Sequence, residues 1–205
     1  MWHSEVIPAP AEATARALVR ASVLTGFYLA GGTGLALQFG HRRSDDLDLF
    51  RTDAFNEEDL VQQTRQAGEF TVVAKAPHTL LILMGGVKVS FLAYAYPVLF
   101  PPQDFLGMKV ADPRDIACMI LNAVASRGTK RDFVHLYEAA TRFGLSRLSA
   151  WFEQKHAGSR HNPVHLQKSL VYFRDAEKDP MPDMLISLSW QEVKQYFCTE
   201  VPRLS

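Results

Sequence analysis

The sequence predicts an α+β fold, in which a mixed sheet with flanking helices is followed by a helical C-terminal half. Short apolar runs bounded by glycine or proline fill the first half and indicate strands, whereas helix-capping signals dominate from Asp112 onward. The chain is 47% hydrophobic and 21% charged, a composition typical of a globular protein. We expect an α/β core over residues 1–105 and a helical region over 106–205; whether they form two domains or one continuous core stays open.

The elements of the first half follow from local signals. The run 11–24 is rich in Ala, Leu and Arg, which favour a helix. Asn56 precedes three acidic residues, which predicts a capped helix over 56–66. The pair Gly85–Gly86 between two apolar runs predicts a hairpin. The predicted strands are 27–30, 47–50, 70–75, 80–84 and 87–92, with a short helix over 33–39.

The second half is predicted to begin with a loop. Three prolines in 94–103 disfavour regular structure, so we expect a loop that closes the sheet region and packs its aromatic residues onto it. Asp112 followed by Pro113 starts a helix that we expect to reach Ser126. The remaining predicted helices are 130–142, 146–155, 164–173 and 190–200.

Charge and composition limit the classes of function. Lys plus Arg and Asp plus Glu each total 22, and this balance argues against a protein that coats nucleic acid with a whole basic face. No uninterrupted apolar run reaches the roughly 18 residues of a membrane span, and the first residues do not resemble a signal peptide. Cys118 and Cys198 lie in no metal-binding spacing, so we expect buried or half-buried free thiols in a cytoplasmic protein without membrane partners.

The segment 27–50 combines three features that suit phosphate chemistry. Gly31–Gly32 after a strand let backbone amides approach a phosphate, and the helix that follows turns its positive end toward it. Thr33 adds a hydroxyl donor. Asp46 and Asp48, two apart on a strand, point to one face, and a carboxylate pair suits Mg²⁺. Each feature alone is more often structural; together they predict a phosphoryl-transfer site.

These residues carry a family resemblance. The segment FYLAGGTGLALQFGHRRSDDLDLF, Phe27 to Phe50, resembles the AbiEii/AbiGii abortive-infection toxin family of the polymerase-β-like nucleotidyltransferase superfamily. The likeness resumes at DIACMILNAVASRGTKRDFVHLY, Asp115 to Tyr137, where the family has a similar R-G-x-x-R-D-F-x-D-L-Y pattern. The resemblance implies a polymerase-β-like mixed sheet and a nucleotidyltransferase site.

The resemblance also assigns roles residue by residue. It implies that the nucleotide-binding residues are Gly31, Gly32, Thr33, Arg42 and Arg131. It implies that the catalytic residues are Asp46, Asp48 and Asp132, of which Asp46 and Asp48 would ligate Mg²⁺. His41 and Arg43 would flank the same cleft. The basic turn around Lys130 is either a solvated turn or a phosphate-facing edge.

Three positions depart from the family pattern. Ser90 stands where a third carboxylate is common, and serine cannot accept a proton at neutral pH without another base. Ile120 replaces a lysine that would neutralise phosphate, a loss for which Lys88 or Lys109 is the candidate substitute. His135 replaces the second aspartate of the later motif. Catalytic competence therefore stays open.

Two functions remain in view. The first is an enzyme that transfers a nucleoside monophosphate from a nucleoside triphosphate to an RNA, such as a tRNA, or to a protein. The resemblance makes it the toxin of a type IV toxin–antitoxin or abortive-infection system, with an antitoxin encoded nearby. The alternative is a catalytically weakened protein of the same fold that binds nucleotide or a partner without turnover. A dinucleotide-binding enzyme is disfavoured, because the helix after the glycines is short and the glycine spacing differs.

The C-terminal histidines admit a metal interpretation that we disfavour. His156, His161 and His165 are close in sequence, but no cysteine or acidic partner accompanies them. We therefore expect surface histidines and no zinc site.

Overall fold

The computed structural model describes residues 2–158 and 162–204, and it contains a seven-stranded mixed sheet in the order β3-β4-β5-β2-β1-β7-β6. β2 is parallel to β5, and β1 is antiparallel to β2 but parallel to β7. The predicted α+β class is confirmed. The strands are β1 Tyr28–Leu29, β2 Leu47–Arg51, β3 Phe70–Ala76, β4 Thr79–Met84, β5 Val87–Ala93, β6 Gln103–Phe105 and β7 Met108–Val110.

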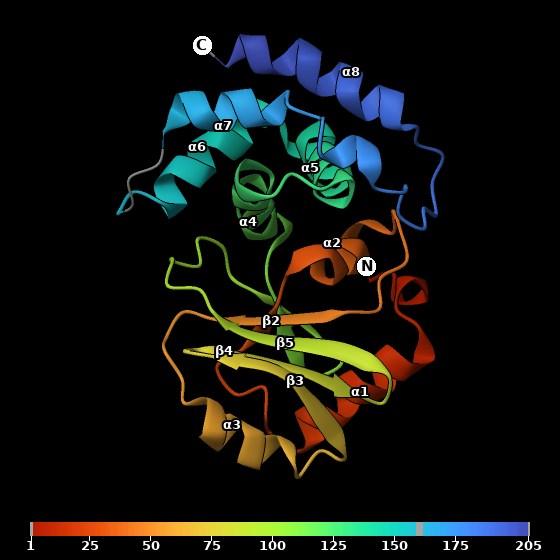
Figure 1. Cartoon of the computed structure of the whole chain (residues 1–205), viewed down its shortest axis with the longest axis vertical. Coiled ribbons are helices and arrows are strands. Elements are labelled where there is room, and N and C mark those ends of the chain that lie inside the picture. Colours follow the sequence, from red (N-terminus) through yellow and green to blue (C-terminus); the bar gives the residue numbers. More distant parts are fainter. Residues whose placement is uncertain (1, 159–161, 205) are drawn as a thin grey trace.

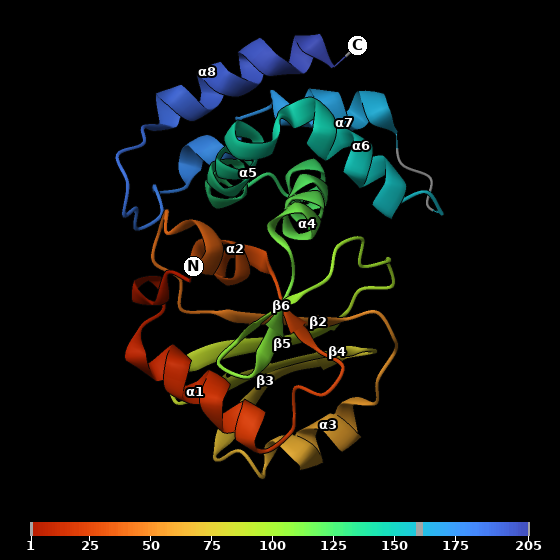
Figure 2. The same ribbon diagram turned by 180° about the vertical axis from the view of Figure 1, so that it is seen from behind.

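Helices cover both faces of this sheet (Figure 1). α1 Ala9–Arg20 and α3 Glu57–Thr64 lie below it, and α2 Gly31–Phe39 lies between the sheet and a group of C-terminal helices, as the view from behind also shows (Figure 2). The α-helices are α1 Ala9–Arg20, α2 Gly31–Phe39, α3 Glu57–Thr64, α4 Pro113–Ser126, α5 Lys130–Phe143, α6 Leu145–Lys155, α7 Pro163–Leu170 and α8 Trp190–Glu200. Among the described residues, none of these helices has the length and hydropathy to cross a membrane.

Alternation along β2 separates a core face from a polar face. Leu47 and Leu49 are each 1% exposed and pack into the hydrophobic core that the sheet shares with α1 and α3. Because successive side chains of a strand point to opposite faces, Asp48 and Phe50 face the C-terminal helices instead. The polar face of the sheet is thus turned toward the helical half.

A second hydrophobic core lies in the helical half. It is built from α4, α5, α6, α7 and α8 and includes Ala30 and Leu35 from the start of α2. Leu37 of the same helix belongs to the core on the other side. α2 therefore joins the two cores, and its N-terminus is held between the sheet and the helical half.

The prediction of a loop over 94–103 is wrong for its last residue, because β6 begins at Gln103. The chain enters a hairpin there, in which β6 and β7 meet at a turn with positive φ at Leu106 and Gly107, and β7 pairs with β1. The sheet thus continues past the boundary predicted at residue 105. Strands of three residues carry too little periodicity to be recognised, and their pairing is a tertiary contact.

The first part of this loop packs on the helical half and not only on the sheet. Lys155 of α6 donates to Asp115 at 2.7 Å and to the carbonyl of Pro97 at 2.6 Å, and Asp115 also accepts from the amide of Phe100. His156 is 2% exposed and bonds the hydroxyl of Tyr94 at 3.0 Å. The expectation of surface histidines is therefore wrong for this residue.

Two smaller expectations have mixed outcomes. His165 is exposed as expected, whereas His161 lies outside the described residues. Both cysteines are free, Cys118 buried and Cys198 exposed, so the prediction of burial holds for Cys118 alone.

Candidate active site

A cleft of about 330 Å³ lies between the polar face of the sheet and the helical half. All eight residues predicted for the site line it: Gly31, Gly32, Thr33, Arg42, Asp46, Asp48, Arg131 and Asp132. Phe50, Met119 and Ile120 supply an apolar part of the wall. Segments far apart in the sequence therefore meet in one cavity with a polar side and an apolar side.

The carboxylate pair lies at the start of β2. Asp48 is in the strand, whereas Asp46 precedes it, so the prediction that both lie on the strand is wrong for Asp46. Asp48 pairs in register with Ser90 of the parallel strand β5, whose side chain hydrogen-bonds the carboxylate. Burial raises the pKa of Asp48, the neighbouring Asp46 adds to that rise, and the Ser90 hydrogen bond opposes it. A cation beside this pair would relieve an unfavourable buried charge.

Glycine is required at the start of α2 by close contacts. Gly31 has a φ of +61°, and a Cβ there would lie 2.8 Å from Oδ2 of Asp48. A Cβ on Gly32 would meet the guanidinium of Arg42 and lie 2.7 Å from Nε2 of His135. The predicted turn is in fact the first turn of the helix, and the leading amides of a helix have no acceptor within the helix, which makes them suitable donors for an anion.

Thr33 has an internal role that its sequence position did not reveal. The side chain is 1% exposed, and its hydroxyl donates to the carbonyl of Asp46 and lies 2.6 Å from the hydroxyl of Ser44. The prediction gave this hydroxyl to a phosphate. The structure uses it to tie the segment that carries Asp46 to the first turn of α2.

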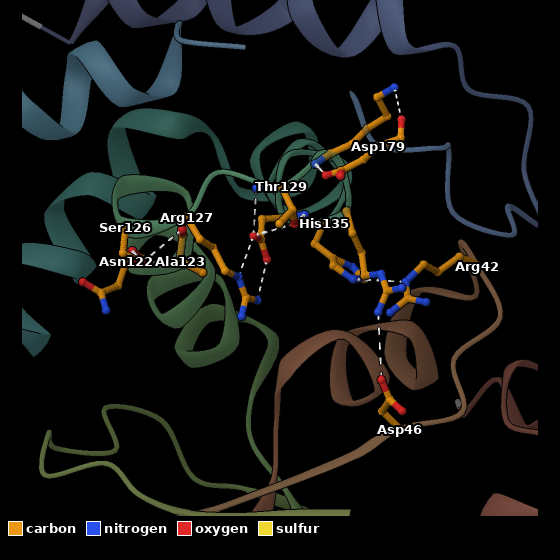
Figure 3. Close-up of polar contacts among 12 residues, drawn as sticks. Arg42, Asp46, Asn122, Ala123, Ser126, Arg127, Thr129, His135 and Asp179 are labelled. Atoms are coloured by element: carbon orange, nitrogen blue, oxygen red, sulfur yellow. Dashed lines mark hydrogen bonds and ion pairs between the residues drawn. The ribbon is translucent and has the colours of Figure 1, made fainter. Parts of the chain in front are cut away.

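Two arginines from different elements lie near the carboxylate pair; one of them forms the ion pair with Asp46 that is drawn as a dashed line in Figure 3. Arg42 is only 5% exposed, and burial lowers the pKa of its guanidinium to about 10. Arg131 of α5 is exposed, and its Nη1 lies 4.0 Å from Oδ2 of Asp46. Both were predicted to bind nucleotide, and both line the cleft.

Asp132 lies in the wall with its carboxylate fully engaged. Arg127 donates two hydrogen bonds to it, at 2.9 and 2.8 Å, and Thr129 forms a capping box with it at the start of α5. Figure 3 shows the Arg127 side chain directed toward this carboxylate. Lys130, beside this pair, is buried and donates to the carbonyl of Asp179 at 2.5 Å, so the turn is packed and not merely solvated.

The position of the missing lysine is apolar in the structure as well. Ile120 is 4% exposed, and no lysine is among the described residues that line the cleft. Lys109 bonds Asp104 in the β6–β7 hairpin, and Lys88 acts on Asp48 only as a nearby charge. The cations that line the cleft are Arg42, Arg127 and Arg131.

A pair of buried histidines, His41 and His135, was not predicted from the sequence. His135 Nδ1 lies 2.9 Å from His41 Nε2, and Arg42 Nε donates to His135 Nε2 at 3.0 Å. Burial, followed by the charge of Arg42, lowers the pKa of His41 to about 3 and that of His135 well below its ordinary value. The departure of His135 from the family pattern was the available signal, but its partner 94 positions away could not be inferred.

The arrangement suits a polyphosphate bound with a divalent cation. Mg²⁺ is commonly held by one or two carboxylates together with substrate phosphates, and Asp46 and Asp48 provide such a pair. Within the described residues no group of three or more His, Cys, Asp or Glu side chains is placed so that it could hold a metal ion. The amides of α2 and the three arginines are donors for phosphate oxygens.

The chain is similar to known proteins. Residues 15–80 match the family described as "Nucleotidyl transferase AbiEii toxin, Type IV TA system". The chain is 35% identical over 190 residues to an uncharacterised protein of Aquifex aeolicus (strain VF5), with 90% of each chain covered. The sequence similarity to this relative extends over nearly the whole chain, including the helical half.

Two solved structures share the fold. A candidate nucleotidyltransferase from Helicobacter pylori has a TM-score of 0.57 at 17% identity, with 95% of this chain and 92% of that chain covered. MenT4, a nucleotidyltransferase toxin of Mycobacterium tuberculosis H37Rv, has a TM-score of 0.56 at 16% identity, covering 97% and 87%. At this identity the likeness concerns the fold, and it extends over the helical half.

Proposed function

The chain belongs to the AbiEii family of nucleotidyltransferase toxins, and from that membership we propose that it transfers a nucleoside monophosphate from a nucleoside triphosphate to an acceptor hydroxyl. The observation that carries the proposal is the approach of Gly31 to Asp48 in one cleft, which brings the first amides of α2 beside a carboxylate pair. Phosphoryl transfer needs positioning and charge stabilisation above all, and this cleft offers both.

We assign the roles within the cleft as follows. Asp46 and Asp48 would hold Mg²⁺, which neutralises charge on the phosphate groups when it is bound. The amides at Gly31–Gly32 and the side chains of Arg42 and Arg131 would hold the phosphates. Asp132, whose carboxylate is bound by Arg127, would position that arginine and not contact the metal.

We further propose a toxin whose acceptor is an RNA, such as a tRNA, or a protein, and whose antitoxin is encoded nearby. The family description and the fold shared with MenT4 support this role. Expression of the chain in a bacterial host should arrest growth, and expression of Asp48→Asn at the same protein level should not. Equal growth arrest by both would contradict a toxicity that depends on the carboxylate pair.

A labelling assay tests the enzymatic activity. The purified chain, Mg²⁺ and each of the four α-³²P nucleoside triphosphates are incubated with total RNA or with a protein extract, and transfer is read from gels. We expect label on one acceptor class, its loss in Asp46→Ala and Asp48→Ala, and its retention in Asp53→Ala, which removes an exposed carboxylate. Label that persists in Asp48→Ala, or no label with any acceptor, would overturn the proposal.

The second candidate is a protein that binds nucleotide without turnover. Two observations favour it, namely the Ser90 side chain beside Asp48 and the apolar Ile120 in the cleft wall. Calorimetry with Mg²⁺ and a nucleoside triphosphate, followed by chromatography of the nucleotide, separates the candidates. Binding with an intact nucleotide supports this candidate, and consumption of the nucleotide supports the enzyme.

A further inference from the structure

A buried cation that forms no ion pair among the described residues lies at the edge of the cleft; Asp45, Asp46 and Asp48 act on it only as nearby charges. Arg42 is 5% exposed, and its pairings in the described part of the chain include no carboxylate within the 4.0 Å of an ion pair. Its hydrogen-bond partners are three neutral acceptors: Nε2 of His135 at 3.0 Å, the carbonyl of Arg43 at 2.6 Å and the hydroxyl of Ser44 at 3.0 Å. A buried charge is costly unless it is compensated, so this site calls for an anion.

The guanidinium is directed at the start of α2. Its Nη2 is the atom that a Cβ on Gly32 would strike first. Arginine has five N–H donors, and three hydrogen bonds leave one donor on each terminal nitrogen. The first turn of α2 adds the positive end of a helix to the same place. An anion near Gly32 would therefore meet a helix N-terminus and a fixed guanidinium together.

The hydrogen-bond pattern sets the state of the His135 ring. Arginine nitrogens only donate, so Nε2 of His135 must accept the bond from Arg42. The single ring proton is then on Nδ1, which donates to Nε2 of His41 at 2.9 Å. A second proton on His135 would break the bond to Arg42, and burial together with the Arg42 charge holds the pKa of His135 well below its ordinary value.

We propose that His135 is a positioning residue for anion binding: its neutral ring fixes Arg42 against the start of α2 without forming an ion pair with it, so that a phosphate group of the ligand becomes the direct counter-ion of the guanidinium. An acidic side chain at this position would hold Arg42 equally well but would neutralise it. The inference rests on the proposed function for the identity of the ligand. It adds that His135 is the residue that leaves the Arg42 guanidinium able to pair with a phosphate.

Two substitutions separate positioning from charge. His135→Gln keeps a neutral acceptor at the place of Nε2, whereas His135→Asp supplies a charged one. Binding of pyrophosphate and of ATP, each with Mg²⁺, is measured by calorimetry, and thermal unfolding is measured in parallel. We expect affinity within about threefold of wild type for the glutamine variant and at least about tenfold weaker binding for the aspartate variant.

Thermal unfolding, measured in parallel with binding, distinguishes a positioning role of His135 from a merely structural one. Because aspartate would pair with the buried guanidinium, we expect His135→Asp to unfold at no lower temperature than His135→Gln while it binds pyrophosphate more weakly. If His135 had only a structural role, the variant with the lower unfolding temperature would also be the one that binds pyrophosphate more weakly. His78→Asp, at an exposed histidine in the β3–β4 turn, is the matched control for one added negative charge and should leave binding unchanged.

Nitrogen-15 spectra of the histidine rings test the neutral state without any ligand. At pH 7 we expect His135 to show a protonated Nδ1 and an unprotonated Nε2. A doubly protonated ring, pyrophosphate binding by His135→Asp at wild-type strength, a loss of about tenfold or more in His135→Gln, or no pyrophosphate binding by the wild type would each overturn the inference. Pyrophosphate binding with these variant effects but no nucleotide transfer would instead overturn the proposed function alone.

Discussion

At the scale of single residues, the cleft is defined by charges that are buried at some cost. Asp48 is an acid whose pKa is raised by burial, and Arg42 is a base whose pKa is lowered by burial. In both cases the folded chain disfavours the charged form, which is typical of sites that bind an ion or a charged ligand. Neither property could be inferred from sequence, because both depend on neighbours brought together by the fold.

Asp48→Asn should separate activity from stability. We expect nucleotide transfer to fall by about 100-fold or more, because one carboxylate of the metal pair is lost. Since the raised pKa of Asp48 means that its ionised form destabilises the fold, the variant should unfold at a higher temperature at pH 7 without metal. This gain should vanish at a pH below the ordinary range of aspartate, where the carboxyl is protonated in both states. A variant that is less stable at pH 7 would contradict the assignment.

The buried His41 should make the protein sensitive to acid. Its pKa is lowered to about 3 in the folded chain, so between the ordinary value and that value only the unfolded chain takes up a proton. The free energy of unfolding should therefore fall as the pH drops, by about 2 kcal/mol for this one group at pH 5. Chemical denaturation at pH 7.5 and pH 5 measures the fall, which His41→Gln should reduce. An equal fall in the variant would mean that His41 does not carry it.

At the scale of elements, α2 illustrates what local sequence can and cannot predict. The glycines, the helix and its end at Gly40 follow from local signals, and the structure has them. The helix begins at Gly31, whereas we expected it at Thr33, because the fold stabilises a left-handed Gly31 against Asp48. The role of the Thr33 hydroxyl was missed for a similar reason, since its partners Ser44 and Asp46 are brought to it by the turn into β2.

Gly31→Ala should damage the site more than the fold. A Cβ at a φ of +61° is strained by about 1–2 kcal/mol, and this Cβ would displace the Asp48 carboxylate. We expect a modest fall in unfolding temperature and a loss of magnesium-dependent nucleotide binding, measured by calorimetry. Gly158→Ala is the control, because a Cβ there meets nothing within 4 Å. Full nucleotide binding by Gly31→Ala would show that the close approach to Asp48 is dispensable.

At the scale of the whole molecule, the cleft exists because two halves meet. The sheet supplies Asp48, the helical half supplies Arg127, Arg131 and His135, and α2 packs into both cores. The sequence predicted the α+β class and most helices, and the eight residues that it predicted for the site are among those that line the cleft. It could not predict the β6–β7 hairpin, the packing of the loop after β5 or the buried histidine pair, since each depends on contacts between distant segments.

Lys155 should be essential to the junction between the halves. It is 1% exposed at its side chain and pairs with Asp115, which is 2% exposed. Lys155→Met would leave the buried carboxylate without its counter-charge, and we expect a loss of about 3–5 kcal/mol in the free energy of unfolding. Lys178→Met, at a side chain that is 76% exposed, is the control. Chemical denaturation measures both, and a loss below about 1 kcal/mol for Lys155→Met would contradict a structural role for the pair.

We propose that a metal-bound nucleotide lies between the first turn of α2 and the carboxylate pair. A crystal structure with Mg²⁺ and a nucleoside triphosphate whose α,β-bridge resists cleavage tests it most directly. We expect phosphate oxygens at hydrogen-bonding distance from the amides of Gly31–Gly32 and from Arg42, with the metal on Asp46 and Asp48. Density for the triphosphate elsewhere, or a metal that avoids both carboxylates, would contradict it.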